Sequence, residues 1–263
     1  MTCKNCNTPI LVEQNYCPEC GAKVIRNRLT LKNLFQHFTE TFFNYDNKLL
    51  QTFINLFKKP EDVIGSYIEG VRKKYANPIS YFGIAITVSG LYLLIANKFF
   101  PEVMDYTIFT SPGQEEFQRR NVSFVQEYQS LFMMLYVPIY AIMARISFIG
   151  YNKFNYTELV VVFLYIQGQM SIVSGILGIL AAAIRINQGI FGLCAIPVMI
   201  LYSAYSLKRL YNLNFTNIVL RTILFFVILL IALMIYSIFL AIFMFLNGDL
   251  QTAIEAKKAA TGK

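Results

Sequence analysis

Five long blocks of apolar residues follow residue 78, and they restrict the possible folds more than any other feature of the sequence. The blocks lie at about 79–100, 130–149, 159–184, 189–207 and 222–246. Each approaches or exceeds the ~20 residues that an α-helix needs to cross a hydrocarbon layer of ~30 Å. The chain is 56% apolar and only 14% charged, whereas soluble domains are typically about a quarter charged. The sequence therefore predicts an all-α integral membrane protein, with a five-transmembrane-helix bundle over 79–250 and a polar tail over 251–263.

The basic residues are distributed unevenly around these blocks. The segment before the first block holds eleven of the 23 Lys and Arg residues, and the second-to-third and fourth-to-fifth connections together hold five more. The other two connections and the tail hold seven. Because cytoplasmic loops are enriched in Lys and Arg, this bias predicts a multi-pass protein of the cell membrane with its N-terminus in the cytoplasm and its C-terminus outside. We interpret the formal charge of +8 as a topology signal, and nucleic acid is disfavoured as a partner.

Four of the five cysteines form two C-x-x-C pairs in the polar segment 1–28. Cys3 and Cys6 form the first pair, and Cys17 and Cys20 form the second. This spacing can bring four thiolates to tetrahedral positions around one zinc ion. Disulfides and a redox-active pair are the alternatives, and a reducing cytoplasm disfavours disulfides. We predict a zinc ribbon with one structural Zn²⁺ per chain, because a closed four-cysteine site leaves no coordination position for a substrate.

The juxtamembrane segment 29–78 carries an amphipathic helical pattern over 29–57. Apolar residues recur there at steps of three and four, with polar residues between them. The apolar positions are Leu31, Phe35, Phe38, Phe42, Tyr45, Leu49, Phe53 and Leu56. Three alternatives are open for this helix: it lies on the bilayer surface, it packs on the transmembrane bundle, or it forms a dimerisation stripe.

A short helix and a basic stretch precede the first apolar block. Pro60, followed by two acidic residues, is typical of a helix start, and we expect this helix to end near Gly70. Asn77 and Pro78 break the chain before the first span. Between these points lie Arg72, Lys73, Lys74 and Tyr75. We interpret them as an interfacial anchor, and the alternative is a site for a lipid headgroup or a protein partner.

The interiors of the apolar blocks contain almost no ionisable residue. Those that occur, Arg145, Glu158, Arg185 and Arg221, fall near predicted helix ends. Because intramembrane charges usually mark transport or catalysis, their scarcity disfavours both activities. The most polar residues deep inside a block are Gln167 and Gln169. For these two we favour hydrogen bonds across helices over an intramembrane polar site for an ion.

The sequence carries no catalytic signature of the kinds H-E-x-x-H, G-x-S-x-G or G-x-x-x-x-G-K-[ST]. It therefore predicts a non-enzymatic membrane scaffold or partner-docking protein. The partners would be the lipid bilayer and either a protein that contacts the zinc ribbon or a second copy of the chain. One alternative is a small transporter or channel with a regulatory cytoplasmic ribbon, using Gln167 and Gln169. Another is a membrane-tethered reader of protein or nucleic acid.

The N-terminal third of the chain resembles a known family. The cysteine pairs are followed by Asp46, Thr52, Leu56, Pro60 and the stretch from Tyr67 to Pro78, YIEGVRKKYANP. Together these residues resemble the bacterial zinc-ribbon membrane proteins of domain-of-unknown-function family 3667, over the chain to about residue 100. The resemblance implies a bacterial inner-membrane protein with a zinc ribbon, and it implies no reaction. The number of predicted spans is also similar, in outline, to the Yip family of five-helix membrane proteins.

Overall fold

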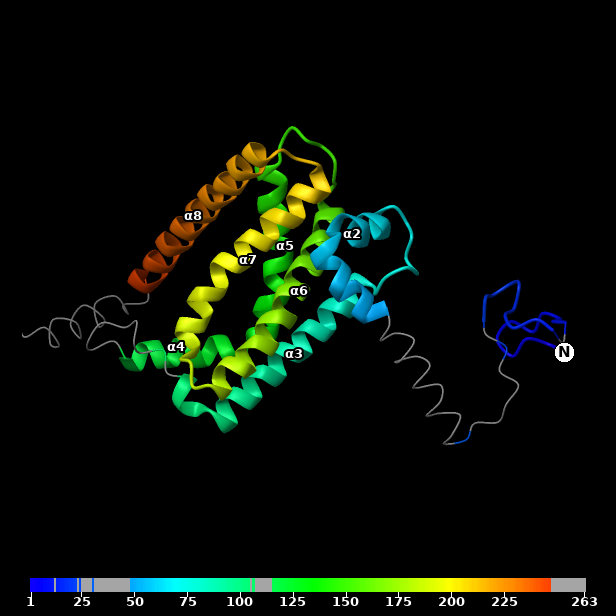
Figure 1. Ribbon diagram of the computed structural model, residues 1–263, viewed down its shortest axis with the longest axis horizontal. Helices are drawn as coiled ribbons and strands as arrows, with labels where there is room; N and C mark the ends of the chain where they lie inside the picture. Colours follow the sequence, from blue (N-terminus) through cyan, green and yellow to red (C-terminus); the bar gives the residue numbers. More distant parts are fainter. Residues whose placement is uncertain are drawn as a thin grey trace, which may run out of the picture. The chain divides into compact units, whose positions relative to one another are not determined.

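The structure is a computed structural model that describes residues 1–11, 13–22, 24, 30, 48–104, 106 and 115–246. The chain divides into two compact units, Met1–Asn47 and Lys48–Lys263, which we call the cysteine unit and the helical unit. The described part of the helical unit is built from α-helices, and five of them are long and apolar enough to cross a membrane. The cysteine unit carries a four-cysteine cluster. These findings confirm the predicted fold class (Figure 1).

The helical unit is a bundle of long helices with shorter helices at its ends (Figure 1). Residues 48–58 are helical and are followed by the remaining elements in chain order. These are α2 (Pro60–Ile68), α3 (Pro78–Phe99), the 3-10 turn η1 (Pro101–Met104), α4 (Glu115–Glu127), α5 (Gln129–Ser147), α6 (Tyr156–Ala183), α7 (Gln188–Tyr211) and α8 (Phe215–Leu246). The five candidate spans are α3, α5, α6, α7 and the Phe215–Ile235 part of α8.

The helices extend beyond their apolar blocks where polar residues cap or continue them. The third span begins at Tyr156 rather than at 159, because Asn155 and Glu158 form a reciprocal capping box before it. The fourth continues from the predicted end at 207 to Tyr211, where Asn212 takes a left-handed conformation. The fifth begins at Phe215 rather than at 222. Polar residues before the apolar block continue the helix, because their side chains can reach the membrane surface. The first two spans lie within two residues of their predicted bounds.

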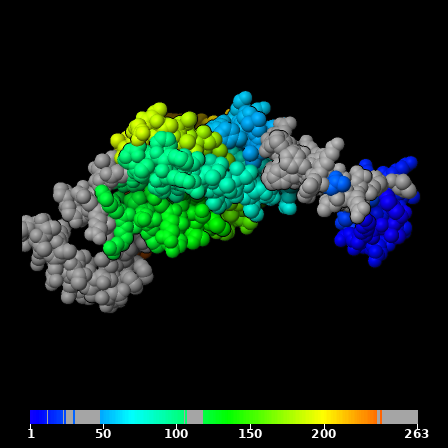
Figure 2. Space-filling model, turned by 90° about the horizontal axis from the view of Figure 1, so that it is seen from below, coloured from blue at the N-terminus to red at the C-terminus, as the bar shows by residue number. Residues whose placement is uncertain are grey.

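Helix α6 lies at the centre of the bundle, and α3 runs along it. In the most apolar 18-residue stretch of each helix, 56% of the residues of α6 are buried, against 6% of those of α8. Three glycines of α6 face α3: a Cβ atom at Gly175 would lie 2.9 Å from Val88 Cγ1, and one at Gly178 would lie 2.7 Å from Tyr92 Cε2. The missing side chains therefore allow the two helices to approach closely. Figure 2 shows the surface of α3 between the α4–α5 region and α7.

The helical residues 48–58 and α2 pack on the bundle. Leu49, Phe53 and Leu56 join its hydrophobic core, and the Ala76 N–H donates to the Thr52 hydroxyl at 2.9 Å. The last part of the amphipathic pattern, within residues 48–58, therefore packs on the bundle, which was one of the three alternatives. The pattern from 31 to 47 lies outside the described residues. The short helix expected after Pro60 is α2, and Gly70 follows it with a φ of +97°.

Candidate metal centre and polar sites of the bundle

The two C-x-x-C loops share one backbone conformation. The Cys3 N–H donates to the Thr8 carbonyl and the Cys17 N–H donates to the Ala22 carbonyl, both at 2.9 Å. Four residues after each first cysteine, Asn7 and Gly21 take positive φ values of 58° and 68°. Glycine and asparagine are the residues that adopt this left-handed conformation most easily. Asn7 therefore forms in the first loop the same tight turn that Gly21 forms in the second.

The loops bring the four predicted ligands together. The sulfur atoms of Cys3, Cys6, Cys17 and Cys20 all lie within 4.8 Å of one another, with Cys3 Sγ 3.7 Å from Cys20 Sγ and Cys6 Sγ 3.5 Å from Cys17 Sγ. Tetrahedral zinc with Zn–S bonds of about 2.3 Å requires sulfur–sulfur separations of roughly 3.8 Å. The cluster therefore has the size and the donor set for a metal ion such as zinc.

Hydrogen bonds favour the thiolate form of two of these cysteines. Hydrogen bonding with Thr8 lowers the pKa of Cys6 to about 6, and hydrogen bonding with Asn5 lowers the pKa of Cys20. The Asn5 N–H also points at Cys3 Sγ at 3.4 Å. Since a metal binds the thiolate and not the thiol, these neighbours favour metal binding by Cys6 and Cys20, whereas burial raises the pKa of Cys17 to about 11.

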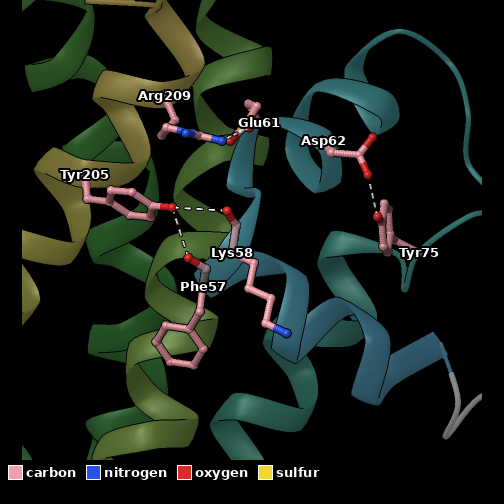
Figure 3. Close-up of polar contacts among 7 residues, drawn as sticks. All are labelled: Phe57, Lys58, Glu61, Asp62, Tyr75, Tyr205 and Arg209. Carbon is pink, nitrogen blue, oxygen red and sulfur yellow. Dashed lines mark hydrogen bonds and ion pairs between the residues drawn. The ribbon is translucent and has the colours of Figure 1, made fainter. Parts of the chain in front are cut away.

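The structure divides the four residues predicted as a headgroup or partner contact. Lys74 Nζ lies 2.7 Å from Asp62 Oδ1, and the Tyr75 hydroxyl donates to Asp62 Oδ2 at 2.5 Å (Figure 3). Burial and this hydrogen bond raise the pKa of Tyr75 to about 12. Arg72 stacks over the Tyr67 ring, and Lys73 is exposed. Tyr75 and Lys74 therefore hold the loop before α3 against α2, and Arg72 and Lys73 present their charges to the surroundings.

A second set of polar contacts joins α7 to the chain before α2. The Tyr202 hydroxyl donates to the Leu56 carbonyl at 3.1 Å, and the Tyr205 hydroxyl donates to the carbonyls of Phe57 and Lys58 (Figure 3). One helical turn further, Arg209 forms an ion pair with Glu61. These tyrosines satisfy carbonyls at the end of the helical segment 48–58, which would otherwise lack partners. No pattern in the sequence pointed to these contacts, although positions 202, 205 and 209 share one helix face.

The two glutamines of α6 have different surroundings. Gln169 is fully buried: its Oε1 accepts a hydrogen bond from the Tyr81 hydroxyl, and its Nε2 donates to the Phe53 carbonyl at 3.0 Å. Gln167 is half-buried and lines a cavity of about 260 Å³ between α5, α6, α7 and α8. Gln169 thus bonds across helices, whereas Gln167 makes no hydrogen bond to the described part of the chain. The two residues do not form one polar site.

The juxtamembrane region matches a known protein family. A family model described as "Protein of unknown function (DUF3667)" matches residues 46–90, which confirms the family resemblance. The matched region contains helical residues 48–58, α2 and the first half of α3, and it includes the residues that bond to α7. No curated protein and no solved structure matches the chain. The chain is thus a multi-pass membrane protein of unknown function with a cysteine cluster that could hold a metal ion.

Proposed function

We propose that this protein is a non-enzymatic inner-membrane scaffold that docks a protein partner through a structural zinc ribbon. The convergence of the four thiols within 4.8 Å of one another carries the proposal. Because four protein ligands complete a tetrahedral zinc shell, the ion would stabilise the fold and would have no open position for chemistry. In this proposal, Cys3, Cys6, Cys17 and Cys20 hold one Zn²⁺ per chain, and the cysteine unit lies in the cytoplasm.

The surface of the cysteine unit supports a docking function. Leu11 is 72% exposed and Tyr16 is 61% exposed, although the unit buries few apolar residues of its own. Exposed aromatic and aliphatic side chains on so small a module are typical of contact points for another protein. The zinc ion would hold the loops that carry them in place.

The helical unit supports a scaffold more than a transporter. Arg145 donates to the Phe154 carbonyl, Glu158 completes a helix cap, Arg185 pairs with Glu102 and Arg221 donates to the Ser147 carbonyl. Each contact lies near a helix end. Gln169, one of the two residues that the alternative transporter or channel would use, takes part in cross-helix hydrogen bonds. Within the described residues, no row of ionisable side chains crosses the bundle.

Photo-crosslinking in native membranes tests the docking proposal. A photoreactive amino acid is placed at Tyr16 in the full-length chain, and the cross-linked products are identified by mass spectrometry. We expect one protein adduct that Cys17→Ser abolishes. As a matched control, Cys194→Ser, which changes the remaining cysteine, should keep the adduct. If no protein adduct forms, or if the adduct survives Cys17→Ser, the docking proposal is wrong.

Reporter fusions at the two ends test the proposed orientation. Five spans place the ends of the chain on opposite membrane faces, and the basic residues predict a cytoplasmic N-terminal end. We expect a cytoplasm-active reporter to work at the N-terminal end and an outside-active reporter to work at the C-terminal end. Cytoplasmic activity at both ends would contradict the orientation and the number of crossings.

A further inference from the structure

The cavity beside Gln167 is lined by residues of four helices and is largely apolar. Its walls include Tyr140 of α5, Phe163 of α6 and Phe225 of α8, and along α7 it extends from Ile196 to Leu207. With a rise of 1.5 Å per residue, this α7 wall is about 16 Å long. Ile196 is 53% exposed, so the cavity reaches the apolar outer surface of the bundle. Its length and its lining fit a hydrocarbon chain that enters from the bilayer.

Two polar side chains face this apolar cavity. Gln167 lies on the α6 wall, and its amide has no hydrogen-bond partner among the described residues. Arg221 lies on the α8 wall near the beginning of that helix. Its Nη1 donates to the carbonyls of Ser147 and Ile149 at 2.8 and 3.4 Å, while its Nε and Nη2 bond to no described residue. The guanidinium also lies over the Tyr151 ring, with Cζ 5.1 Å from the ring centroid, and its two remaining donors favour an anion.

We propose that this cavity binds one acyl chain of an anionic phospholipid. The Nε and Nη2 groups of Arg221 would donate to the phosphate, and the Gln167 amide would donate to an ester carbonyl of the same lipid. An amide left without a partner in apolar surroundings is unfavourable, and an ester carbonyl supplies the acceptor it lacks. The site is independent of the cysteine unit, so it does not rest on the docking function proposed above.

Photo-labelling with lipid probes tests this site in the full-length chain reconstituted in vesicles. The probes are phosphatidylglycerol and phosphatidylcholine with a diazirine on one acyl chain, and a free fatty acid with the same diazirine. We expect phosphatidylglycerol to label the α7 and α8 walls about tenfold more than phosphatidylcholine, because both lipids offer the phosphate but the choline cation of the second would lie near the Arg221 charge and be repelled by it. Equal labelling by the two phospholipids, or equal labelling by the fatty acid, would overturn the proposal.

Four variants separate binding from folding. Ala204→Phe fills the cavity and should abolish specific labelling, whereas Leu201→Phe, at a 69% exposed position on the same helix, should leave it unchanged. Gln167→Leu should reduce phosphatidylglycerol labelling several-fold. Arg221→Lys keeps the charge and should retain part of the preference for phosphatidylglycerol over phosphatidylcholine. Wild-type labelling in Ala204→Phe, measured on protein with a wild-type thermal unfolding transition, would contradict the site.

Discussion

The cysteine unit buries only Cys3, Ile10 and Cys17 among its described residues, whereas the helical unit buries a continuous core that five long helices share. In the first unit, two short loops with the same hydrogen bonds place four sulfur atoms together, and a metal ion would supply the missing stabilisation. In the second, stability comes from close helix contacts and from polar side chains that bond across long stretches of sequence. The small unit therefore depends on a few ligands, whereas the bundle distributes its stability over many contacts.

The largest expected effect is confined to the cysteine unit. Cys17→Ser removes one ligand, and a zinc module of this size draws about 10–16 kcal/mol of apparent folding free energy from its metal. We expect the zinc content to fall from one ion per chain to none and the cysteine unit to become sensitive to protease. The thermal unfolding of the helical unit should not change. The control Cys194→Ser should keep one zinc per chain, and zinc retained in Cys17→Ser would refute the ligand set.

Within the helical unit, Gln169→Leu should have the largest effect. It leaves the Tyr81 hydroxyl without a partner in a buried site, at about 1–3 kcal/mol, and removes one hydrogen bond to the Phe53 carbonyl, at about 0.5–1.5 kcal/mol. The expected loss of unfolding free energy, about 2–4 kcal/mol by the same reasoning, can be measured by denaturant titration in detergent. Gln167→Leu is the matched control and should not lower this free energy, because the Gln167 amide has no hydrogen-bond partner among the described residues. Equal losses in the two variants would contradict the different surroundings of these residues.

Close packing of α3 on α6 predicts an intermediate effect. In Gly178→Ala the new Cβ would lie 2.7 Å from the Tyr92 ring, which cannot swing freely because its hydroxyl donates to Gln188 at 2.6 Å. We expect a loss of about 1–3 kcal/mol in unfolding free energy. Gly90→Ala, where the added atom has nothing within 4 Å, should be neutral or stabilising by up to about 1 kcal/mol. If Gly178→Ala behaves like Gly90→Ala, the two helices are not in close contact.

The smallest effect concerns the acidic residues at the start of α2. Hydrogen bonds with Arg209 lower the pKa of Glu61, and hydrogen bonds with Lys74 and then Tyr75 lower the pKa of Asp62. Because the folded pKa values are depressed, the unfolded chain binds more protons as the pH falls. The contribution of these contacts is therefore present above about pH 4.5 and is lost as the pH falls through the lowered values.

Thermal unfolding of the wild type and of Glu61→Gln at pH 7 and pH 3 measures this contribution. Since the ion pair is partly exposed, Glu61→Gln should cost about 0–1 kcal/mol at pH 7. At pH 3 the difference between the two proteins should shrink. Glu69→Gln, at an exposed position, should be neutral at both values. A difference that grows at pH 3 would contradict the sign derived from the pKa shifts.

Much of the fold could be predicted because its signals are local. An apolar block of about 20 residues predicts a spanning helix wherever it lies, and the family model matches the region in which the resemblance was seen. The helix ends were less predictable. The fifth span begins at Phe215, seven residues before its expected start, because hydropathy marks the apolar part of a helix and not its hydrogen-bonded ends.

The contacts between distant segments could not be predicted from local patterns. Tyr202 and Tyr205 donate hydrogen bonds to carbonyls almost 150 residues away. Every residue has a backbone carbonyl, so the sequence does not show which one a side chain will reach. Tyr75 was expected to face lipid or a partner, yet it is buried against Asp62. Whether a tyrosine near a span anchors in the interface or packs inside depends on which helix covers it.

Spacing and hydropathy act over short distances, and they are enough to predict the four cysteine ligands, the five apolar helices and the juxtamembrane region that the family model matches. The packing of the helices settles that Gln169 bonds across helices while Gln167 faces a cavity, and that α7 holds the chain before α2. These two glutamines are alike in type and two residues apart, so their difference arises from the directions in which a helix turns its side chains and from what the other helices place there.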